Sequence, residues 1–92
     1  QNKIISRDCL IKGGIASTTV DVRLVLKRAL EVGATAVVLA HNHPTGNLVP
    51  SSADLQLTKK MNEAAKILDI RLLDHLIVSE KNYFSFADEN KL

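Results

Sequence analysis

The residues best suited to chemistry in this chain gather between positions 41 and 54. His41 and His43 are separated by one residue, and Asp54 follows a short loop after them. Neutral imidazole nitrogens suit Zn²⁺, and an aspartate oxygen is an acceptable third ligand. Three protein ligands leave a fourth coordination position open for water, which is typical of a catalytic rather than a structural zinc site. The segment therefore predicts Zn²⁺ bound by His41, His43 and Asp54.

A second interpretation of the same segment needs no metal ion. A pair of histidines at the end of a strand can simply be solvated or hydrogen-bonded. Ser51 and Asp54 also form the Ser-x-x-Asp pattern of a capping box, in which each side chain accepts a hydrogen bond from the other residue's backbone N–H. The residue types alone leave both interpretations open. More specific is the joint occurrence of His-x-His-Pro and Ser-x-x-Asp where a strand, a loop and a helix meet.

The elements around these residues are expected to bring them together. Residues 35–40 form a continuous apolar run of strand length, which predicts a central strand buried on both faces. Residues 41–50 contain many turn formers and predict a loop. Ser51 is expected to cap a helix over residues 52–68, with Asp54 in its first turn. The loop is long enough to fold that first turn back over the two imidazoles.

The rest of the chain predicts one mixed sheet with helices packed on it, an α/β fold. The inner side of the second helix is expected to carry Leu55, Leu57, Met61, Ala64, Ala65 and Leu68. The other expected elements are an extended segment over residues 2–12 before Gly13-Gly14, a helix from Val20 to Gly33 with its N-cap among residues 17–19, strands over residues 70–78 and 83–86, and a short helix or coil over residues 87–92.

Composition limits the classes of protein that the chain can represent. Its 92 residues suit a single domain with one modest core. A net charge of +2 and an aromatic content of 3% do not support nucleic-acid binding. The longest uncharged apolar run, residues 34–40, is too short to span a membrane. Cys9 is the only cysteine, which excludes an internal disulfide and suits a reducing, cytoplasmic location.

Two further residues have a chemical and a structural interpretation. His75 follows Asp74 in an apolar strand, so this carboxylate could orient the imidazole behind a metal ligand. A lone histidine in a strand is more often a hydrogen-bonded structural residue, and this interpretation is favoured. Cys9 could be a redox thiol, but Arg7 and Lys12 are the only cations near it in the sequence, so a structural role is favoured there as well.

Taken together, His-x-His-Pro and Ser-x-x-Asp resemble the JAMM (MPN+) zinc metallohydrolase motif, and most closely its bacterial RadC-like branch. Six residues, 45–50, separate Pro44 from Ser51. The resemblance extends over nearly the whole chain, through the segments 2–5, 13–14, 36–40, 73–78 and 83–86. It implies a JAB/MPN-like (cytidine-deaminase-like) mixed sheet flanked by two main helices.

The resemblance also implies an activity. His41, His43 and Asp54 would be the zinc ligands, and Ser51 would be a catalytic residue that supports the oxyanion or the metal-bound water. The implied reaction is hydrolysis of an amide or isopeptide bond by zinc-activated water, with a protein or peptide as substrate.

One departure from the family's pattern leaves open whether the chain is an enzyme. JAMM enzymes use a glutamate as general base, and in RadC-like chains it precedes the segment that matches residues 2–4. That position would lie before Gln1. Asp8 and Glu31 are the nearest acidic residues inside the chain, and neither is expected to replace it. Residues 1–92 are thus expected to be a single RadC-like JAB/MPN domain without its N-terminal strand and catalytic glutamate, and the unpaired sheet edge would favour a homodimer.

Two alternatives keep the fold without the catalysis. One is a non-catalytic MPN-type binding module associated with DNA repair or recombination, as the family's usual name suggests, although the small net charge gives this association no physical support. The other is a structural MPN domain that binds a protein partner. Bound zinc would distinguish the hydrolase from both.

Overall fold

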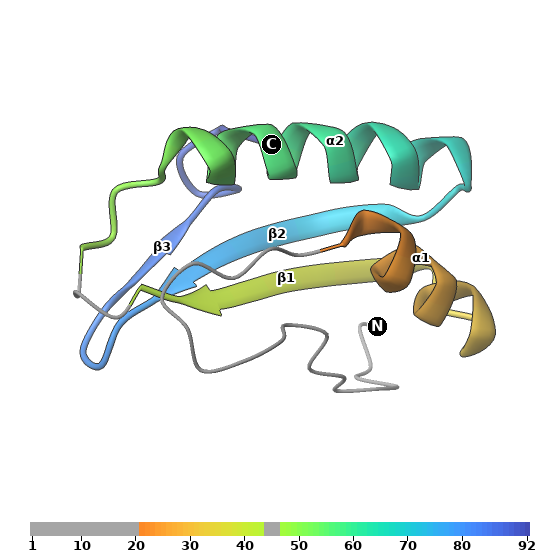
Figure 1. Cartoon of the computed structure of the whole chain (residues 1–92), viewed down its shortest axis with the longest axis horizontal. Helices are drawn as coiled ribbons and strands as arrows, with labels where there is room; N and C mark the ends of the chain where they lie inside the picture. The colour runs from red at the N-terminus through yellow and green to blue at the C-terminus, as the bar shows by residue number, and fades with distance from the viewer. Residues whose placement is uncertain (1–20, 44–46) are drawn as a thin grey trace.

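The computed structural model describes residues 21–43 and 47–92. Along this part of the chain lie helix α1 (Val22–Glu31), strand β1 (Ala36–Asn42), helix α2 (Ser52–Ile67), strand β2 (Arg71–Val78) and strand β3 (Tyr83–Ser85). The arrangement is a small α/β fold with a mixed sheet and two helices, consistent with a JAB/MPN-like domain (Figure 1). The fold class expected from the sequence is confirmed.

The described strands form a sheet in the order β1-β2-β3. β1 pairs with β2 in parallel, and β2 pairs with β3 in an antiparallel hairpin. Helix α2 is the crossover between the two parallel strands, as such a connection requires. Because of this topology, α2 begins at the end of the sheet where β1 stops (Figure 1). The first turn of α2 is thereby brought to the carboxyl end of β1.

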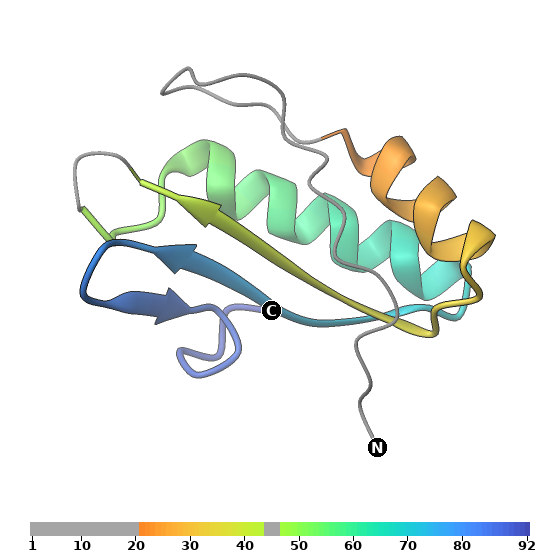
Figure 2. The same ribbon diagram turned by 90° about the horizontal axis from the view of Figure 1, so that it is seen from below.

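Both helices share one apolar core with the sheet. Viewed from below, the strands lie in front of α2, and α1 lies near the end where β1 begins (Figure 2). The core cluster combines residues from α1, β1, α2 and the start of β2: Val22, Leu26, Ala29, Leu39, Met61, Ala65, Ile70 and Leu72. The core is concentrated at the end away from the two histidines, which leaves a more polar set of side chains between α2 and the sheet near His41.

The boundaries of α1 differ in part from those expected. Its N-cap is Asp21, whose side chain accepts a hydrogen bond from the backbone N–H of Arg23, so the expected cap among residues 17–19 is wrong. The expected end is confirmed, because Val32 is the C-cap and Gly33 adopts a φ of +69°. An aspartate is as good an N-cap as serine or threonine, and Asp21 is the last of these residue types before the helix begins.

Helix α2 has the expected start at Ser52 and ends at Ile67, with Leu68 as its C-cap. Met61 and Ala65 are buried as expected, and Leu57 and Ala64 pack against the core. Leu55 and Leu68, however, are 46% and 41% exposed. Thr58, which the apolar pattern did not include, is only 2% exposed. The buried face of α2 is therefore rotated toward Asp54 and Thr58 at its N-terminal end.

Strand β1 also differs from the expectation of a central strand buried on both faces. Leu39 is buried, whereas Val38 is 52% exposed, so burial follows one face. Among the described strands β1 lies at one end of the sheet order. It also continues to Asn42, two residues beyond its expected end at Ala40, because β2 extends far enough to pair His41 with Ile77 and Asn42 with Val78.

The remaining elements follow the expectations closely. β2 begins one residue after the expected position, and β3 ends one residue before it. The C-terminal segment after Ser85 forms turns, in which the backbone N–H of Lys91 donates to the carbonyl of Phe86. No helix in residues 21–43 or 47–92 is long and apolar enough to cross a membrane. The extended segment over residues 2–12, the Gly13-Gly14 break, Asp8 and Cys9 lie outside the described residues.

The turn after α1 provides a test of the fold. Replacement of Gly33 by alanine is expected to destabilise the protein by about 1 kcal/mol, since L-residues with a side chain rarely adopt a positive φ. No neighbouring atom lies within 4 Å of a Cβ at this position, so the loss would come from backbone conformation alone. Gly33→Asn is the matched control, because asparagine tolerates this conformation better. Urea unfolding of both variants checks the expectation, and equal stability of Gly33→Ala and the parent would contradict it.

Candidate metal centre

The alternation of an extended backbone positions the two histidines. Successive side chains of a strand point to opposite faces, so residues two apart share a face. His41 lies in β1, and His43 continues the same backbone direction, since its N–H donates to the carbonyl of Val78. Both imidazoles accordingly project from the same face as buried Leu39. This is the face against which α2 packs.

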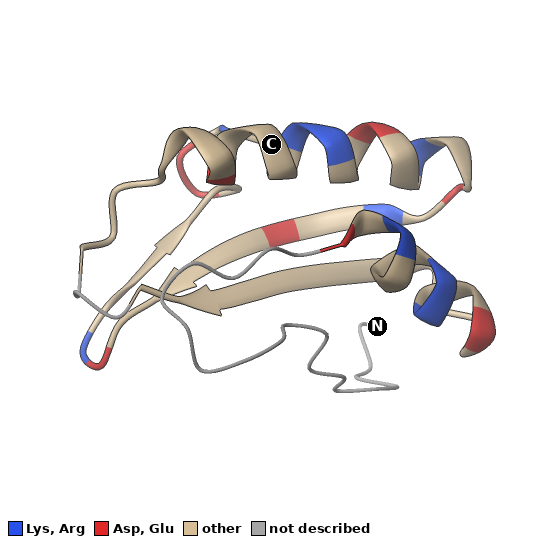
Figure 3. Ribbon diagram, viewed as in Figure 1, with Lys and Arg blue, Asp and Glu red and all other residues tan. Residues whose placement is uncertain are grey.

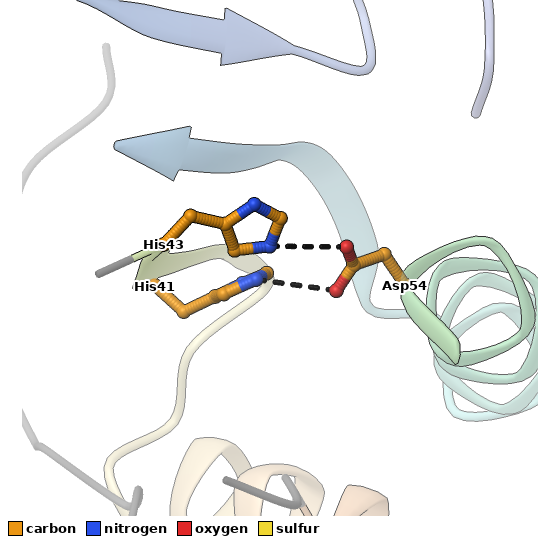
Figure 4. A group of neighbouring side chains, drawn as sticks. All are labelled: His41, His43 and Asp54. Atoms are coloured by element: carbon orange, nitrogen blue, oxygen red, sulfur yellow. Dashed lines mark ion pairs between the residues drawn. The ribbon is translucent and has the colours of Figure 1, made fainter. Parts of the chain in front are cut away.

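The carboxylate of Asp54 lies between α2 and these two imidazoles. His41 Nε2 is 3.1 Å from Asp54 Oδ1, and His43 Nε2 is 3.2 Å from Asp54 Oδ2 (Figure 4). The ligand atoms of the three residues all lie within 4.8 Å of one another. In residues 21–43 and 47–92 this is the only such group of histidine, cysteine or acidic side chains. The structure thus brings together the three residues that the sequence predicts as metal ligands.

Asp54 is held in place by a capping box. Its Oδ2 accepts a hydrogen bond of 2.7 Å from the backbone N–H of Ser51, and its own N–H donates to Ser51 Oγ over 3.1 Å. The same carboxylate therefore completes the cap of α2 and faces both histidines. The capping and metal-binding interpretations are compatible, because the carboxylate that completes the cap also faces both imidazoles.

The hydrogen bond on the far side of His43 defines which ring nitrogen is available. His43 Nδ1 contacts the backbone carbonyl of Asn47. A carbonyl oxygen can only accept, so Nδ1 must carry the proton. In the neutral ring, Nε2 then carries no proton, and its lone pair is directed at Asp54. Metal-bound histidines are held in this way, with the second ring nitrogen bonded to a carbonyl or carboxylate.

The distances also fit a small cation. For Zn²⁺ with ligand bonds of roughly 2.0–2.1 Å and tetrahedral angles, neighbouring ligand atoms lie about 3.3 Å apart. The separations of 3.1 and 3.2 Å between imidazole nitrogen and carboxylate oxygen are close to this value. An unprotonated nitrogen and a carboxylate oxygen repel each other at that distance unless a cation lies between them. The donor set therefore fits a metal ion.

Protonation states in the cluster agree with this arrangement. Burial lowers the pKa of His41 below its ordinary value, although the Asp54 charge acts in the opposite direction. Burial would raise the pKa of Asp54, but hydrogen bonds from Ser51 and the nearby histidines bring it below its ordinary value. At neutral pH the cluster combines a neutral His41 with an ionised Asp54. A metal ion needs both of these forms as ligands.

His75 lies directly behind His41. Its backbone pairs with Leu39 in the β1–β2 register, and its Nε2 is 3.0 Å from His41 Nδ1. Burial, followed by the proximity of His41, lowers the pKa of His75 to about 4. Its Nδ1 lies 2.6 Å from the hydroxyl of Thr58. His75 is buried and hydrogen-bonded, as the structural interpretation expected, but it also contacts a candidate ligand.

The expected partner of His75 is different from the one observed. The Asp74 carboxylate does not hold the imidazole; Oδ1 accepts from the backbone N–H groups of His75 and Ala87, and Oδ2 accepts from Ser85 Oγ. Adjacent residues of a strand point to opposite faces, so Asp74 cannot reach the His75 ring. The Thr58 hydroxyl contacts the His75 ring instead. Sequence reasoning did not identify it, because the one indication, a threonine four residues after Asp54 on the same helical face, is common in helices without such a role.

Comparison with known proteins assigns the family. The chain matches the family model of the RadC-like JAB domain over residues 1–92. It belongs to the RadC-like JAB domain family. Relatives of this RadC-like domain include UPF0758 proteins of Flavobacterium johnsoniae, 60% identical over 96% of the chain, and Porphyromonas gingivalis, 50% identical over 98%. UPF0758 protein YfjY of Escherichia coli is 47% identical over the whole chain. The RadC-like domain described here corresponds to 38%, 40% and 58% of these three relatives' lengths.

The capping box gives a stability prediction for the RadC-like domain. Ser51→Ala removes the acceptor for the Asp54 N–H and is expected to lower the free energy of unfolding by about 0.5–2 kcal/mol. Ser51→Asp should retain most of the stability, because aspartate is also a good N-cap. Ser52→Ala is the matched control, since the side chain of Ser52 is exposed and follows the cap. Urea denaturation measures all three, and a Ser51→Ala variant as stable as Ser52→Ala would argue against the cap.

Proposed function

We propose that this domain is a zinc-dependent hydrolase of amide or isopeptide bonds. The observation that carries the proposal is the cluster of His41 Nε2, His43 Nε2 and the Asp54 carboxylate, whose ligand atoms all lie within 4.8 Å of one another. Two nitrogens and one carboxylate are the ligand types of catalytic zinc sites, which keep a further position open. When bound, such an ion would act as a Lewis acid toward a carbonyl group and toward water.

The chain's own residues define what each would contribute. His41 and His43 would bind the ion as neutral ligands, and Asp54 would add one negative charge. Ser51 lies beside Asp54 at the start of α2, with an exposed side chain. Its hydroxyl accepts the Asp54 N–H and keeps its own proton, which it can donate to the developing negative charge on a substrate oxygen. Ser51 is therefore proposed as a catalytic residue in addition to its role as cap.

Charge on the surface is more compatible with a peptide than with a nucleic acid as substrate. Both lysines and acidic residues occur along α2 and in the β2–β3 turn, and α1 carries three cations followed by Glu31 (Figure 3). The net charge of the whole chain is +2. Proteins that bind nucleic acid through phosphates need a concentrated basic surface. A protein or peptide substrate is the proposal that these charges support.

The first test of the proposal is zinc binding. The parent is expected to bind about one Zn²⁺ per chain, and His41→Ala, His43→Ala and Asp54→Asn should each weaken binding by more than about 100-fold, the upper range for changes to residues that only support a ligand. Glu63→Gln is the matched control, because Glu63 is an exposed carboxylate of the same helix. Competition titration with a chromogenic chelator measures the affinities. Parent-like binding by the three ligand variants would show that the assignment is wrong.

The second test is hydrolysis. Ser51→Asp is expected to keep the fold and lower turnover of a peptide or isopeptide-linked substrate, because it places a second negative charge where the substrate oxygen would develop charge. Turnover is compared with that of the parent at equal zinc content. Full turnover by Ser51→Asp would show that Ser51 acts only as the N-cap of α2 and has no catalytic role. Zinc binding without hydrolysis of any amide substrate would favour a non-catalytic binding module.

The acid/base group is expected to lie outside the described residues. Within them, Asp54 is the only carboxylate in ion-pair contact with His41 or His43, and Glu31 pairs with Arg28 on α1. A positioned acid/base group typically contributes 10²–10⁴-fold to a rate. The proposal is that the 92-residue chain hydrolyses substrate at least about 100-fold more slowly than a longer protein that also carries the family's glutamate. Equal rates at equal zinc content would place the group within residues 1–92.

A further inference from the structure

A closed path of polar contacts connects the backbone of Asp54 to its own side chain. The path starts at the Asp54 carbonyl, which accepts a hydrogen bond of 2.8 Å from the Thr58 hydroxyl. Thr58 Oγ1 then contacts His75 Nδ1, and His75 Nε2 contacts His41 Nδ1. His41 Nε2 finally faces Asp54 Oδ1. Four side chains from three elements are thus linked around the candidate metal centre.

The direction of these hydrogen bonds follows from the number of protons available. The Thr58 hydroxyl has one proton, and the Asp54 carbonyl can only accept, so this proton is used on the carbonyl. Thr58 Oγ1 must therefore accept from His75 Nδ1–H over 2.6 Å. A neutral His75 protonated at Nδ1 has an unprotonated Nε2, which accepts from His41 Nδ1–H over 3.0 Å. His41, in turn, is left with an unprotonated Nε2.

The opposite direction is chemically complete but fits the geometry less well. In it, the Thr58 hydroxyl donates to His75 Nδ1, His75 Nε2–H donates to His41, and His41 Nε2–H donates to Asp54. That arrangement needs no metal ion. It would, however, place the Thr58 oxygen 2.8 Å from the Asp54 carbonyl oxygen with no proton between them. Two oxygen acceptors at that distance repel each other. In the first direction the corresponding close pair is unprotonated His41 Nε2 and Asp54 Oδ1, which a bound cation would stabilise, so the metal-bound protein favours the first direction.

The position of His75 leaves its ring little freedom to change this pattern. Its side chain is stacked on Phe86, with ring centroids 4.6 Å apart and planes inclined by 8°. His75 is 1% exposed and Phe86 is fully buried, so water does not compete for the ring nitrogens. The backbone N–H of His75 is held by Asp74. Thr58 is likewise 2% exposed.

From these contacts we infer that Thr58 and His75 are positioning residues that hold His41 as its Nδ1–H tautomer and leave its Nε2 free to bind the metal ion. The inference rests on the metal centre of the proposed function. His43 reaches the same tautomer by a different route, through the carbonyl of Asn47. Both imidazoles are thereby prepared with the same nitrogen directed at Asp54. Partners of this kind typically contribute 10–100-fold to metal affinity.

The first experiment reads the tautomers directly. The chain contains 3 histidines, so a long-range ¹H–¹⁵N spectrum of zinc-loaded protein near neutral pH can be assigned from single-histidine variants. The expected result is the Nδ1–H form for both His75 and His41. Detection of either as the Nε2–H form in the zinc-loaded protein would overturn the inference, whereas failure to bind zinc at all would overturn the proposed function. Its failure is thus distinguishable from failure of the metal centre.

The second experiment measures zinc affinity in matched variants of Thr58. Thr58→Val keeps the shape but removes the hydroxyl, and it should weaken zinc binding by about 10-fold, the lower range for such partners. Thr58→Ser restores the hydroxyl and should restore the parent affinity and the parent tautomers. A role in packing alone predicts the opposite order, because valine preserves both branches of the side chain and serine does not. Parent-like affinity in Thr58→Val would contradict the inference.

A third variant tests His75 itself. His75→Phe retains an aromatic ring to stack on Phe86 and removes both nitrogens, and it is expected to weaken zinc binding by about 10–100-fold. The His41 signal should then no longer be confined to the Nδ1–H form. If this variant does not fold, the Thr58 pair decides the question. A folded His75→Phe variant with unchanged affinity and an unchanged His41 tautomer would overturn the inference.

Discussion

The carboxylate of Asp54 is the contact on which the site depends, because it joins the first turn of α2 to the end of β1. One of its oxygens accepts from the backbone of Ser51 and faces His43, and the other faces His41. Because this carboxylate both completes the cap of α2 and faces the histidines, it links the conformation of the loop between β1 and α2 to the position of the candidate ligands. If α2 frayed at its start, Asp54, the third candidate ligand, would move away from the two histidines. The stability of the N-terminal end of α2 and the geometry of the candidate metal centre therefore depend on the same carboxylate.

Local patterns in the sequence were sufficient to predict most of this arrangement. His-x-His in an extended segment places two rings on one face whatever the rest of the fold, and Ser-x-x-Asp specifies a cap through neighbouring backbone groups. The order of strands and helices likewise predicted one mixed sheet with helices packed on it. Such features depend on residues close together in the chain, and for this reason the cluster of candidate ligands, the cap and the fold class could be predicted from the sequence.

Features that depend on tertiary contacts could not be predicted in the same way. Thr58 reaches His75 only because α2 is rotated so that its polar N-terminal turn faces the sheet, while Leu55 remains exposed. Sequence adjacency suggested Asp74 as the partner of His75, although neighbouring residues in a strand diverge. The exposure of Val38 depends on the position of β1 in the sheet order, which an apolar run does not reveal.

The stacking of Phe86 on His75 has a consequence for the extent of the functional unit. Phe86 follows the last strand, and its backbone is bonded to His75 on one side and to Lys91 on the other. The turns after β3 therefore cover His75, which belongs to the path of polar contacts around the candidate metal centre. They are not dispensable for that path. A chain cut after Ser85 would keep every candidate ligand and every described strand of the sheet, yet it would open the buried side of His75 to water. Where a protein is shortened or joined to another domain, the boundary has to be drawn from such contacts, because the ends of regular elements do not mark them.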